Sequence, residues 1–356
     1  MKILFGIHGT SHKEIAQSEI VEFQNRGFQT IVCTYGNWGS VNGLINSFKL
    51  IIKNAVEIKK QAAAQQSDFI YLNTGLDFKT VIRDAITVFI LKRGNIKGKI
   101  VLKIHGSQNE ILFSKTNLLK KYLFRKTDLF LLLSEEEKYN FLSIGLAPEK
   151  VQVTANVIDK SLYAPDPEFK KTIGVAESTS VLLFVGRFMY EKGIIDLVEA
   201  CRLLKKESLD FRLVCLGNGP LFDEVQGLIK TYGLEENIKT LGHIPESETR
   251  YYYANCEMSI LPTYHSEGFP MAVFQAVGAG RPVITTNIRA ATDYFKEYEN
   301  CLWVEKKNPA QLAKQIANLM KDKNLQQKMR DNNLVLAEKF TAAKIVDKVL
   351  EYLKKI

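Results

Sequence analysis

The 356-residue chain is long enough for two domains, and its 46% hydrophobic and 24% charged residues are typical of a globular rather than a disordered protein. No apolar run reaches the roughly 18 residues that a membrane span needs, and the N-terminal apolar stretch is too short for a signal peptide, so we expect a cytoplasmic protein. The five cysteines form no C-x-x-C pair, which argues against a metal knuckle and a disulfide framework.

The net charge of +9 is unevenly distributed along the chain. Residues 41–126 contain 16 Lys or Arg against 5 Asp or Glu, a net +11. Within this segment, 48–60 and 117–126 combine cations with apolar residues at helical spacing. For either stretch alone, a soluble helix with one solvated basic face is an equal alternative to a helix on an anionic membrane. Together they favour peripheral association with the inner face of a membrane. No nucleic-acid-binding module is recognisable, so we expect no nucleic-acid partner.

The first half of the chain alternates short apolar runs with longer amphipathic stretches. This alternation is typical of a mostly parallel sheet with helices on both faces. We expect strands at 2–7, 28–33, 68–72, 100–104 and 129–133, and helices near 11–26, 41–65, 78–93, 108–126 and 135–144. A further strand near Val151 leads toward 162–167, where two prolines and acidic residues indicate a domain linker.

A second alternation begins at Ser180. We expect strands at 181–185, 211–216, 238–241, 258–261 and 283–284, helices at 193–206, 221–232, 247–254 and from 270, and an almost wholly helical end at 309–356 that breaks near Phe340. The sequence therefore predicts an α/β protein with two doubly wound, Rossmann-like domains facing each other across a cleft. The first would span 1–158 together with a helix at about 341–356, and the second 159–340.

The stretch 263–285, TYHSEGFPMAVFQAVGAGRPVIT, joins a buried strand to a helix. Glu267 and Gly268 lie in its polar loop, and the helical pattern begins near Pro270. The N-terminus of a helix offers free backbone N–H groups and a favourable dipole to an anion. A carboxylate beside such a site suggests a ligand that carries both hydroxyls and phosphate, such as a sugar nucleotide.

The E-G-F-P element, the helix after it and the G-R-P-V-I run at 280–284 resemble the signature of retaining GT-B glycosyltransferases of family four, the glycosyl transferases group 1. The resemblance implies a GT-B fold whose first domain holds the acceptor and whose second binds a nucleotide-diphosphate sugar. We favour a UDP-sugar as the donor, with a GDP-sugar as the open alternative. It also implies that Glu267 is catalytic and contacts the donor sugar. The donor would further meet the loop residues Gly268, Phe269, Pro270 and Met271.

Glycines and cations follow the strands of the second half. Gly186, Arg187 and Lys192 match the G-R-x4-K element of the same family. Alone, Arg187 and Lys192 would be ordinary surface cations, whereas the resemblance implies that they bind the diphosphate. It also places the turn at Gly217 close to the nucleotide. The turn with His243 and Ile244 resembles the stretch whose backbone pairs with the base.

The first half contributes His105 and Gly9. His105 belongs to a V-x-x-x-H-G pattern, similar to a family element in which the histidine reaches hydroxyls of the transferred sugar. A packing or capping role is the alternative, and we favour the catalytic one. Gly9 follows the first strand, where many relatives have a glycine-rich turn against the diphosphate.

Three features depart from the family pattern or qualify it. Gln275 stands where the second signature Glu would hold the ribose, so donor binding should weaken more than chemistry. The loop 287–293 lacks the usual glycines. No Asp-x-Asp element occurs, so we expect metal-independent transfer with no metal site and no cofactor besides the donor.

These expectations describe a retaining hexosyltransferase of polysaccharide or cell-envelope biosynthesis that acts on a lipid-linked or surface glycan. Two alternatives remain open. A catalytically weak or silent sugar-nucleotide binder would explain Gln275 more simply. A GT-B sugar-nucleotide epimerase would share the nucleotide cleft but needs carboxylates for proton transfer at the sugar, and no pattern marks them.

Overall fold

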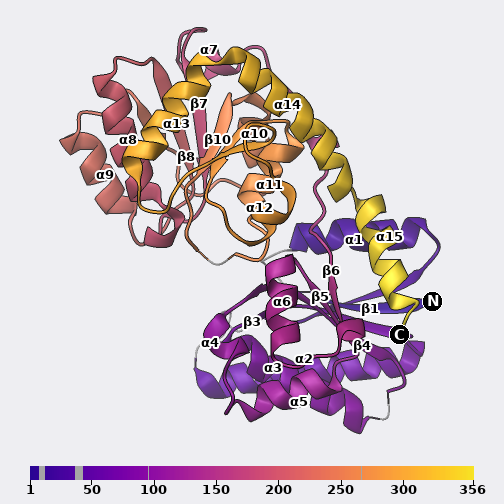
Figure 1. Cartoon of the computed structure of the whole chain (residues 1–356). Helices are drawn as coiled ribbons and strands as arrows, with labels where there is room; N and C mark the ends of the chain where they lie inside the picture. The colour runs from indigo at the N-terminus through magenta and orange to yellow at the C-terminus, as the bar shows by residue number, and fades with distance from the viewer. Residues whose placement is uncertain (8–12, 37–42, 95, 266) are drawn as a thin grey trace. The chain divides into compact units, whose positions relative to one another are not determined.

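A computed structural model describes residues 1–7, 13–36, 43–94, 96–265 and 267–356. The chain forms two compact units (Figure 1). The first contains Met1–Val157, the described residues 267–269 and the C-terminal segment Ala342–Ile356. The second contains Ile158–His265 and Pro270–Thr341.

The first unit is built on a six-stranded, fully parallel sheet with strand order β2-β1-β3-β4-β5-β6. Buried apolar side chains from both strands and helices fill its core. Its strands are β1 (Lys2–Ile7), β2 (Gln29–Thr34), β3 (Phe69–Leu76), β4 (Lys99–Ser107), β5 (Leu129–Leu132) and β6 (Val151–Val153). Its helices are α1 (Lys13–Asn25), α2 (Leu44–Gln65), α3 (Phe78–Arg93), α4 (Asn109–Leu112), α5 (Leu118–Lys126), α6 (Glu135–Ser143), the 3-10 turn η1 (Pro148–Lys150) and α15 (Ala342–Leu353).

Helices cover both faces of this sheet, with α2, α3 and α5 on one face and α1, α6 and α15 on the other (Figure 1). The C-terminal helix α15 packs against α1, where Arg26 donates hydrogen bonds to the Asp347 carboxylate and, at 2.9 Å, to the Ala343 carbonyl oxygen. Tyr352 adds a bond to the Val153 carbonyl oxygen at 3.1 Å. The last helix of the chain is therefore an integral part of the first unit.

The second unit repeats the same architecture with strand order β12-β11-β10-β7-β8-β9, again fully parallel. Its strands are β7 (Ser180–Val185), β8 (Phe211–Leu216), β9 (Ile238–Thr240), β10 (Met258–Leu261), β11 (Val283–Thr285) and β12 (Cys301–Trp303). Its helices are α7 (Phe169–Thr172), α8 (Ile194–Lys206), α9 (Phe222–Thr231), α10 (Glu246–Asn255), α11 (Met271–Gly278), α12 (Arg289–Tyr294), α13 (Pro309–Lys321) and α14 (Lys323–Ala337), with 3-10 turns η2 (Lys160–Leu162), η3 (Tyr190–Lys192) and η4 (Glu338–Phe340). The predicted α/β organisation with two parallel sheets is confirmed.

The single helix predicted over 108–126 is wrong, because the structure has two helices there, α4 and α5. Asn117 caps α5 by accepting a hydrogen bond from the Lys120 backbone N–H at 2.9 Å. The Lys120 ammonium reaches back to the carbonyl oxygens of Leu112 and Ser114, at 2.6 and 2.7 Å. These bonds satisfy the end of one helix and the start of the next, so a break costs little here.

All five cysteines are buried and unpaired. Burial raises the pKa of the Cys33 thiol to about 11, with a smaller contribution from Glu57, and raises the pKa of Cys256 to about 12. They act as small apolar side chains of the core, as expected. None of the helices in the described ranges has both the length and the apolarity to cross a bilayer.

Candidate functional site

Three glycine turns meet at the carboxyl edge of the second sheet, where β7, β8 and β9 end. The Gly186 N–H bonds the Leu216 carbonyl oxygen at 3.0 Å, and the Gly217 N–H bonds the Gly242 carbonyl oxygen at 2.7 Å. Gly217 has φ +134°, and a Cβ there would collide with the Gly186 carbonyl oxygen. Only glycine therefore allows these backbones to approach. The structure thus brings together the predicted residues Gly186 and Gly217 and the turn that leads into His243 and Ile244.

The two predicted cations flank a short turn beside this edge. Arg187 is exposed directly after Gly186, and the half-buried Lys192 ends η3. Gly193 follows with φ +71°, where a Cβ would collide with the Pro262 carbonyl oxygen at the end of β10. This close approach places the Lys192 turn against the start of the 263–285 stretch.

A single carbonyl oxygen joins the Lys192 turn to that stretch. The Glu191 carbonyl oxygen accepts bonds from the Thr263 hydroxyl at 3.0 Å, the Tyr264 N–H at 2.8 Å and the His265 N–H at 3.1 Å. Because three donors meet one acceptor, the turn and the chain that leads into Glu267 are held in one arrangement.

A third cation, Lys307, lies beside the same turn and was not predicted. Its ammonium stands 6.0 Å from the ring centroid of Tyr190 and 5.4 Å from that of Tyr264. Both distances suit cation–π attraction. Lys307 lies more than 40 residues from either ring in sequence, so no local pattern marks it.

Gln275 is bonded to a carboxylate that the sequence analysis did not single out. The Gln275 amide donates from Nε2 to Oε1 of Glu246 at 2.8 Å. Glu246 is the first residue of α10 and follows the His243–Ile244 turn by two positions. Arg250, one turn further on, has a guanidinium nitrogen 4.0 Å from the same oxygen. The edge therefore carries an acid close to position 275 despite the missing second Glu.

In the first unit, His105 lies two residues before the end of β4, next to an irregularity in the β3–β4 pairing between Thr74 and Leu76. Its Nε2 lies 3.0 Å from Oδ1 of Asn73. A carbonyl oxygen only accepts, so in the neutral ring Nε2 carries the proton and Nδ1 the lone pair. Such irregularities re-aim side chains near functional sites.

A buried glutamate, Glu137, joins the His105 turn to residues 267–269. Ser107 donates to its Oε1 at 2.7 Å, and the Glu137 side chain is fully buried. A Cβ added to Gly268 would lie 3.0 Å from both Glu137 Oε2 and the His105 carbonyl oxygen. The structure therefore brings His105 and Gly268 together. The sequence analysis did not single out Glu137, because an acidic residue in the first turn of a helix is already explained by its favourable interaction with the helix dipole.

The other predicted residues are placed as follows. Glu267 is half-exposed, and with Gly268 and Phe269 it clusters with the first unit. Pro270 and Met271 begin α11 in the second unit. Gly9 lies outside the described residues. At the start of α12, which follows β11, the buried Arg289 adopts φ +37°, a conformation that costs a non-glycine residue free energy.

Among the described residues, no group of three or more His, Cys, Asp and Glu side chains is arranged to hold a metal ion.

Residues 165–334 match the family model described as Glycosyl transferases group 1. The chain is 29% identical over 233 residues to the putative colanic acid biosynthesis glycosyltransferase WcaL of Escherichia coli, which covers 63% of this chain and 56% of the relative. It is 24% identical over 253 residues to the N-acetyl-alpha-D-glucosaminyl L-malate synthase of Bacillus anthracis, covering 70% of this chain and 65% of that one. The chain thus spans little more than half the length of the first relative.

The fold is similar to that of Anabaena HepE, solved in complex with UDP and glucose, with a TM-score of 0.77 and 19% identity over the full length of both chains. This likeness confirms the predicted GT-B fold class.

Proposed function

We propose that the protein, whose residues 165–334 match the glycosyl transferases group 1, transfers a sugar from a nucleotide-diphosphate sugar to a hydroxyl acceptor, with retention at the anomeric carbon. A UDP-sugar is the favoured donor. HepE, which shares the fold, was solved with UDP and glucose. The acceptor we propose is a lipid-linked or surface glycan. The E. coli relative carries a colanic acid biosynthesis name.

The observation that carries this proposal is the assembly at the carboxyl edge of the second sheet. Three strand ends lie together there, and the turn that bears Lys192 is bonded to the 263–285 stretch. In doubly wound folds, nucleotides bind at this edge. Arg187 and Lys192 would neutralise the diphosphate, Arg187 through its planar fork and Lys192 as a point charge. The turn with His243 and Ile244 would receive the base.

We propose that Glu267 and His105 act on the donor sugar. Glu267 would accept hydrogen bonds from its hydroxyls and stabilise positive charge at the anomeric carbon. His105 would use the Nδ1 lone pair for another hydroxyl, because Asn73 holds Nε2. In the transfer, the bond from the anomeric carbon to the β-phosphate oxygen breaks and its electron pair leaves with the diphosphate. The acceptor oxygen bonds to the same carbon, and its proton passes to the leaving phosphate.

A panel of UDP- and GDP-sugars tests the activity and separates it from the two alternatives. Each donor is incubated with the protein, and nucleoside diphosphate release is measured with thermal stabilisation. A transferase releases the diphosphate, slowly to water and faster to acceptor glycans. A silent binder is stabilised without turnover, and an epimerase yields an isomeric sugar nucleotide. Either of the last two results would refute the proposed transfer.

We further predict that Glu246 and Gln275 together bind the ribose hydroxyls. Glu246→Gln removes the only charge of this pair, so the Kd for UDP should rise about tenfold, as expected for one charge-assisted hydrogen bond. Gln275→Glu alone sets two carboxylates against each other and should not tighten binding. The double swap Glu246→Gln/Gln275→Glu moves the charge across the pair and should restore the affinity to within about threefold.

Isothermal titration with UDP measures these affinities. Glu248→Gln, an exposed acid on the same helix, is the matched control and should leave the Kd unchanged. If Glu246→Gln binds UDP as tightly as the wild type, this pair does not hold the ribose.

Helix α2 is the element through which we propose that the first unit meets an anionic membrane. Its exposed side includes Leu44, Phe48, Ile52 and Val56, spaced four residues apart and 40–72% exposed, with Ile45 beside them. Lys49 and Lys53 are exposed on the same helix. Exposed apolar side chains interleaved with cations suit the interface of an anionic bilayer.

Replacing Phe48 and Ile52 with serine should lower partitioning onto vesicles of phosphatidylcholine and phosphatidylglycerol at least about tenfold. The reason is that two apolar side chains that would be buried in the bilayer are lost. Co-sedimentation measures the bound fraction. Leu334→Ser/Val335→Ser removes two exposed apolar residues of α14 and should change nothing. Equal binding by all three proteins would exclude α2 as the docking element.

A further inference from the structure

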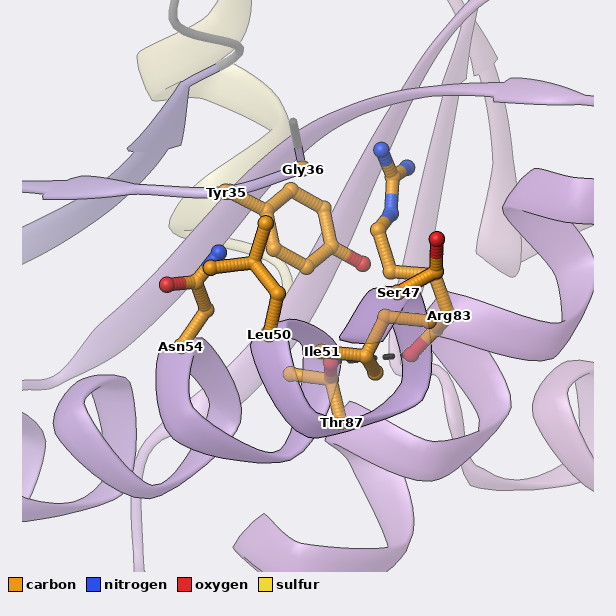
Figure 2. A pocket seen from close by; sticks show the side chains of 8 residues that line it. All are labelled: Tyr35, Gly36, Ser47, Leu50, Ile51, Asn54, Arg83 and Thr87. Atoms are coloured by element: carbon orange, nitrogen blue, oxygen red, sulfur yellow. Dashed lines mark hydrogen bonds between the residues drawn. The ribbon is translucent and has the colours of Figure 1, made fainter. Parts of the chain in front are cut away.

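A small hollow lies in the first unit between the end of β2, helix α2 and helix α3 (Figure 2). It contains about 280 Å³ of empty space, part of it open to solvent. Its polar lining includes Ser47 and Asn54 of α2 and Arg83 and Thr87 of α3, and the Tyr35 ring forms one wall. The enclosed part of the hollow, about 10 Å³, has room for one group the size of a water molecule, so it suits a single oxygen rather than a whole sugar.

Among the described residues that line this hollow, Arg83 alone is charged, and it is only 6% exposed. Its Nε donates to Oδ1 of Asp84 at 2.7 Å and its Nη2 donates to the Thr74 hydroxyl at 2.5 Å. Its Cζ stands 4.1 Å from the centroid of the Tyr35 ring. Burial by itself lowers the pKa of Arg83, but Asp84 and Tyr35 outweigh it and raise the pKa, so the charge persists.

One end of this guanidinium has no acceptor. Of the five N–H donors of an arginine, those on Nη1 have no hydrogen-bond partner among the described residues. Nη1 lies against Gly36, where a Cβ would collide with it and φ is +86°. Figure 2 shows the guanidinium beside Gly36 and the Tyr35 ring. Nη1 is not one of the fully buried side-chain atoms without a partner in the described part of the chain, so it is open to solvent, and the oxygen of a ligand can reach it.

The neighbouring carboxylate does not occupy that position. Asp84 accepts from Arg83 and from the Tyr35 hydroxyl through Oδ1, and from Thr74 through Oδ2 at 2.5 Å. Three donors therefore hold its negative charge on the Nε and Nη2 side of the guanidinium. An incoming anion would meet the opposite edge, where the N–H groups of Nη1 are available.

The place of the hollow in the fold also points to a ligand. Tyr35 follows β2 directly and Thr74 lies near the end of β3, so the hollow is at the carboxyl edge of the first sheet. This is the edge at which open α/β sheets bind ligands. Ser47 and Asn54 line the hollow from α2, the helix whose other side carries the exposed apolar residues. A ligand that carries an oxyanion next to an apolar chain would match both sides of α2, with the oxyanion in the hollow and the chain along the exposed apolar residues.

We propose that this hollow is an oxyanion site, in which Arg83 binds an oxygen of a phosphate or carboxylate group carried by the acceptor. The site rests on the proposed function only in that its ligand is an acceptor of the transferase. Asn54, which also lines the hollow, would add a neutral hydrogen bond. The same chemistry serves a lipid-linked phosphate and a free or sugar-borne oxyanion.

Inorganic phosphate is the probe, added to the full-length protein at saturating UDP so that the diphosphate site is filled. At constant ionic strength, phosphate should raise the Tm of the wild type by about 2–4 °C at a tenfold excess over its Kd, with half-saturation on the order of 1–10 mM. Arg83→Gln should abolish this shift. Arg93→Gln removes an arginine from the same helix outside the hollow and should retain it.

Asn54→Phe covers the case in which Arg83→Gln does not fold, because the half-buried Asn54 lines the hollow, and a larger side chain there should fill its space and leave Arg83 and its partners in place. It too should abolish the phosphate shift. If phosphate does not stabilise the wild type, or stabilises Asn54→Phe equally, the site does not exist. The stabilisation by UDP is read in the same proteins. Its absence would count against the proposed transferase rather than against the oxyanion site.

Vesicles identify the source of the oxyanion once the phosphate shift is established. Phosphatidylcholine vesicles that contain a polyisoprenyl phosphate are compared with vesicles that contain an equal fraction of phosphatidylglycerol. A preference for the first that Asn54→Phe removes supports a lipid-linked phosphate at Arg83. Equal binding to both, with the phosphate shift intact, supports a free or sugar-borne oxyanion at the same site.

Discussion

Replacing Glu267 with alanine should lower the rate of sugar transfer by about 10²–10³-fold, the loss expected when one group that stabilises charge in the transition state is removed. The affinity for UDP should stay within about threefold of the wild type, because the proposed contacts of Glu267 are to the sugar and not to the nucleotide. Release of UDP from the donor sugar, measured under single-turnover conditions, gives the rate, and titration with UDP gives the affinity.

Two further variants sharpen this result. Glu267→Gln keeps the size and two hydrogen-bonding atoms but loses the charge, so most of the rate loss should remain if the charge matters. Glu235→Ala removes an exposed acid in the second unit and should leave the rate unchanged. If Glu267→Ala retains more than about a third of the wild-type rate, Glu267 has no part in catalysis.

The largest loss of stability should come from replacing Lys103, whose ammonium is paired with Glu19 in the core of the first unit. The side chains of both residues are at most 1% exposed. The Lys103 ammonium also bonds the Ala155 carbonyl oxygen at 3.3 Å, and Tyr71 donates to Glu19 Oε2 at 3.3 Å. Lys103→Met leaves Glu19 as an unpaired buried acid, which should cost about 3–5 kcal/mol of the free energy of unfolding.

Calorimetry measures this loss as a decrease of about 6–20 °C in the Tm of the first unit. The double variant Lys103→Met/Glu19→Leu removes both charges and should recover most of the loss, since a well-packed apolar pair is often as stable as a buried ion pair. Lys160→Met, which breaks the exposed pair with Glu338, is the control and should cost at most about 1 kcal/mol. A Tm for Lys103→Met equal to the wild type would show that the pair contributes nothing to folding.

The regular elements were largely predictable because their apolar periodicity is local. The helix α3 spans Phe78–Arg93 as predicted, and Asp77 caps it by accepting from the N–H groups of Lys79 and Thr80 at 2.8 and 3.0 Å. The strands β8 and β10 also have the predicted bounds. Each of these segments is bounded by turn or capping residues that belong to the same short window.

One error in the predicted helices arose because the periodic spacing of apolar residues continues across a break between two helices. Between α4 and α5, apolar residues keep a helical spacing, and only the long Lys120 side chain and the Asn117 cap make the interruption stable. The short strand β12 was missed. Cys301–Trp303 is three residues long and is defined by its pairing with β11.

For the candidate site, local sequence patterns reveal even less, because several of its contacts join residues that are far apart in the sequence. Arg187, Lys192 and Gly217 were found because they follow strand ends in a recognisable order. Glu246 is paired with Gln275 across 29 positions, and Glu137 meets Ser107 across 30. Such pairs depend on which helices the fold brings together. Arg83 was hidden for another reason, because an arginine inside an amphipathic helix reads as a solvated residue until its burial is known.

The proposed function depends above all on a diphosphate bound at the carboxyl edge of the second sheet, and titration with UDP, UMP and uridine tests this binding most directly. The wild type should bind UDP at least tenfold more tightly than UMP and UMP more tightly than uridine, because the proposed contacts of Arg187 and Lys192 are to phosphate. Arg187→Ala/Lys192→Ala should remove that order by weakening UDP most, UMP less and uridine not at all. Equal affinities for the three ligands in the wild type, or an unchanged preference for UDP in the double variant, would contradict the account.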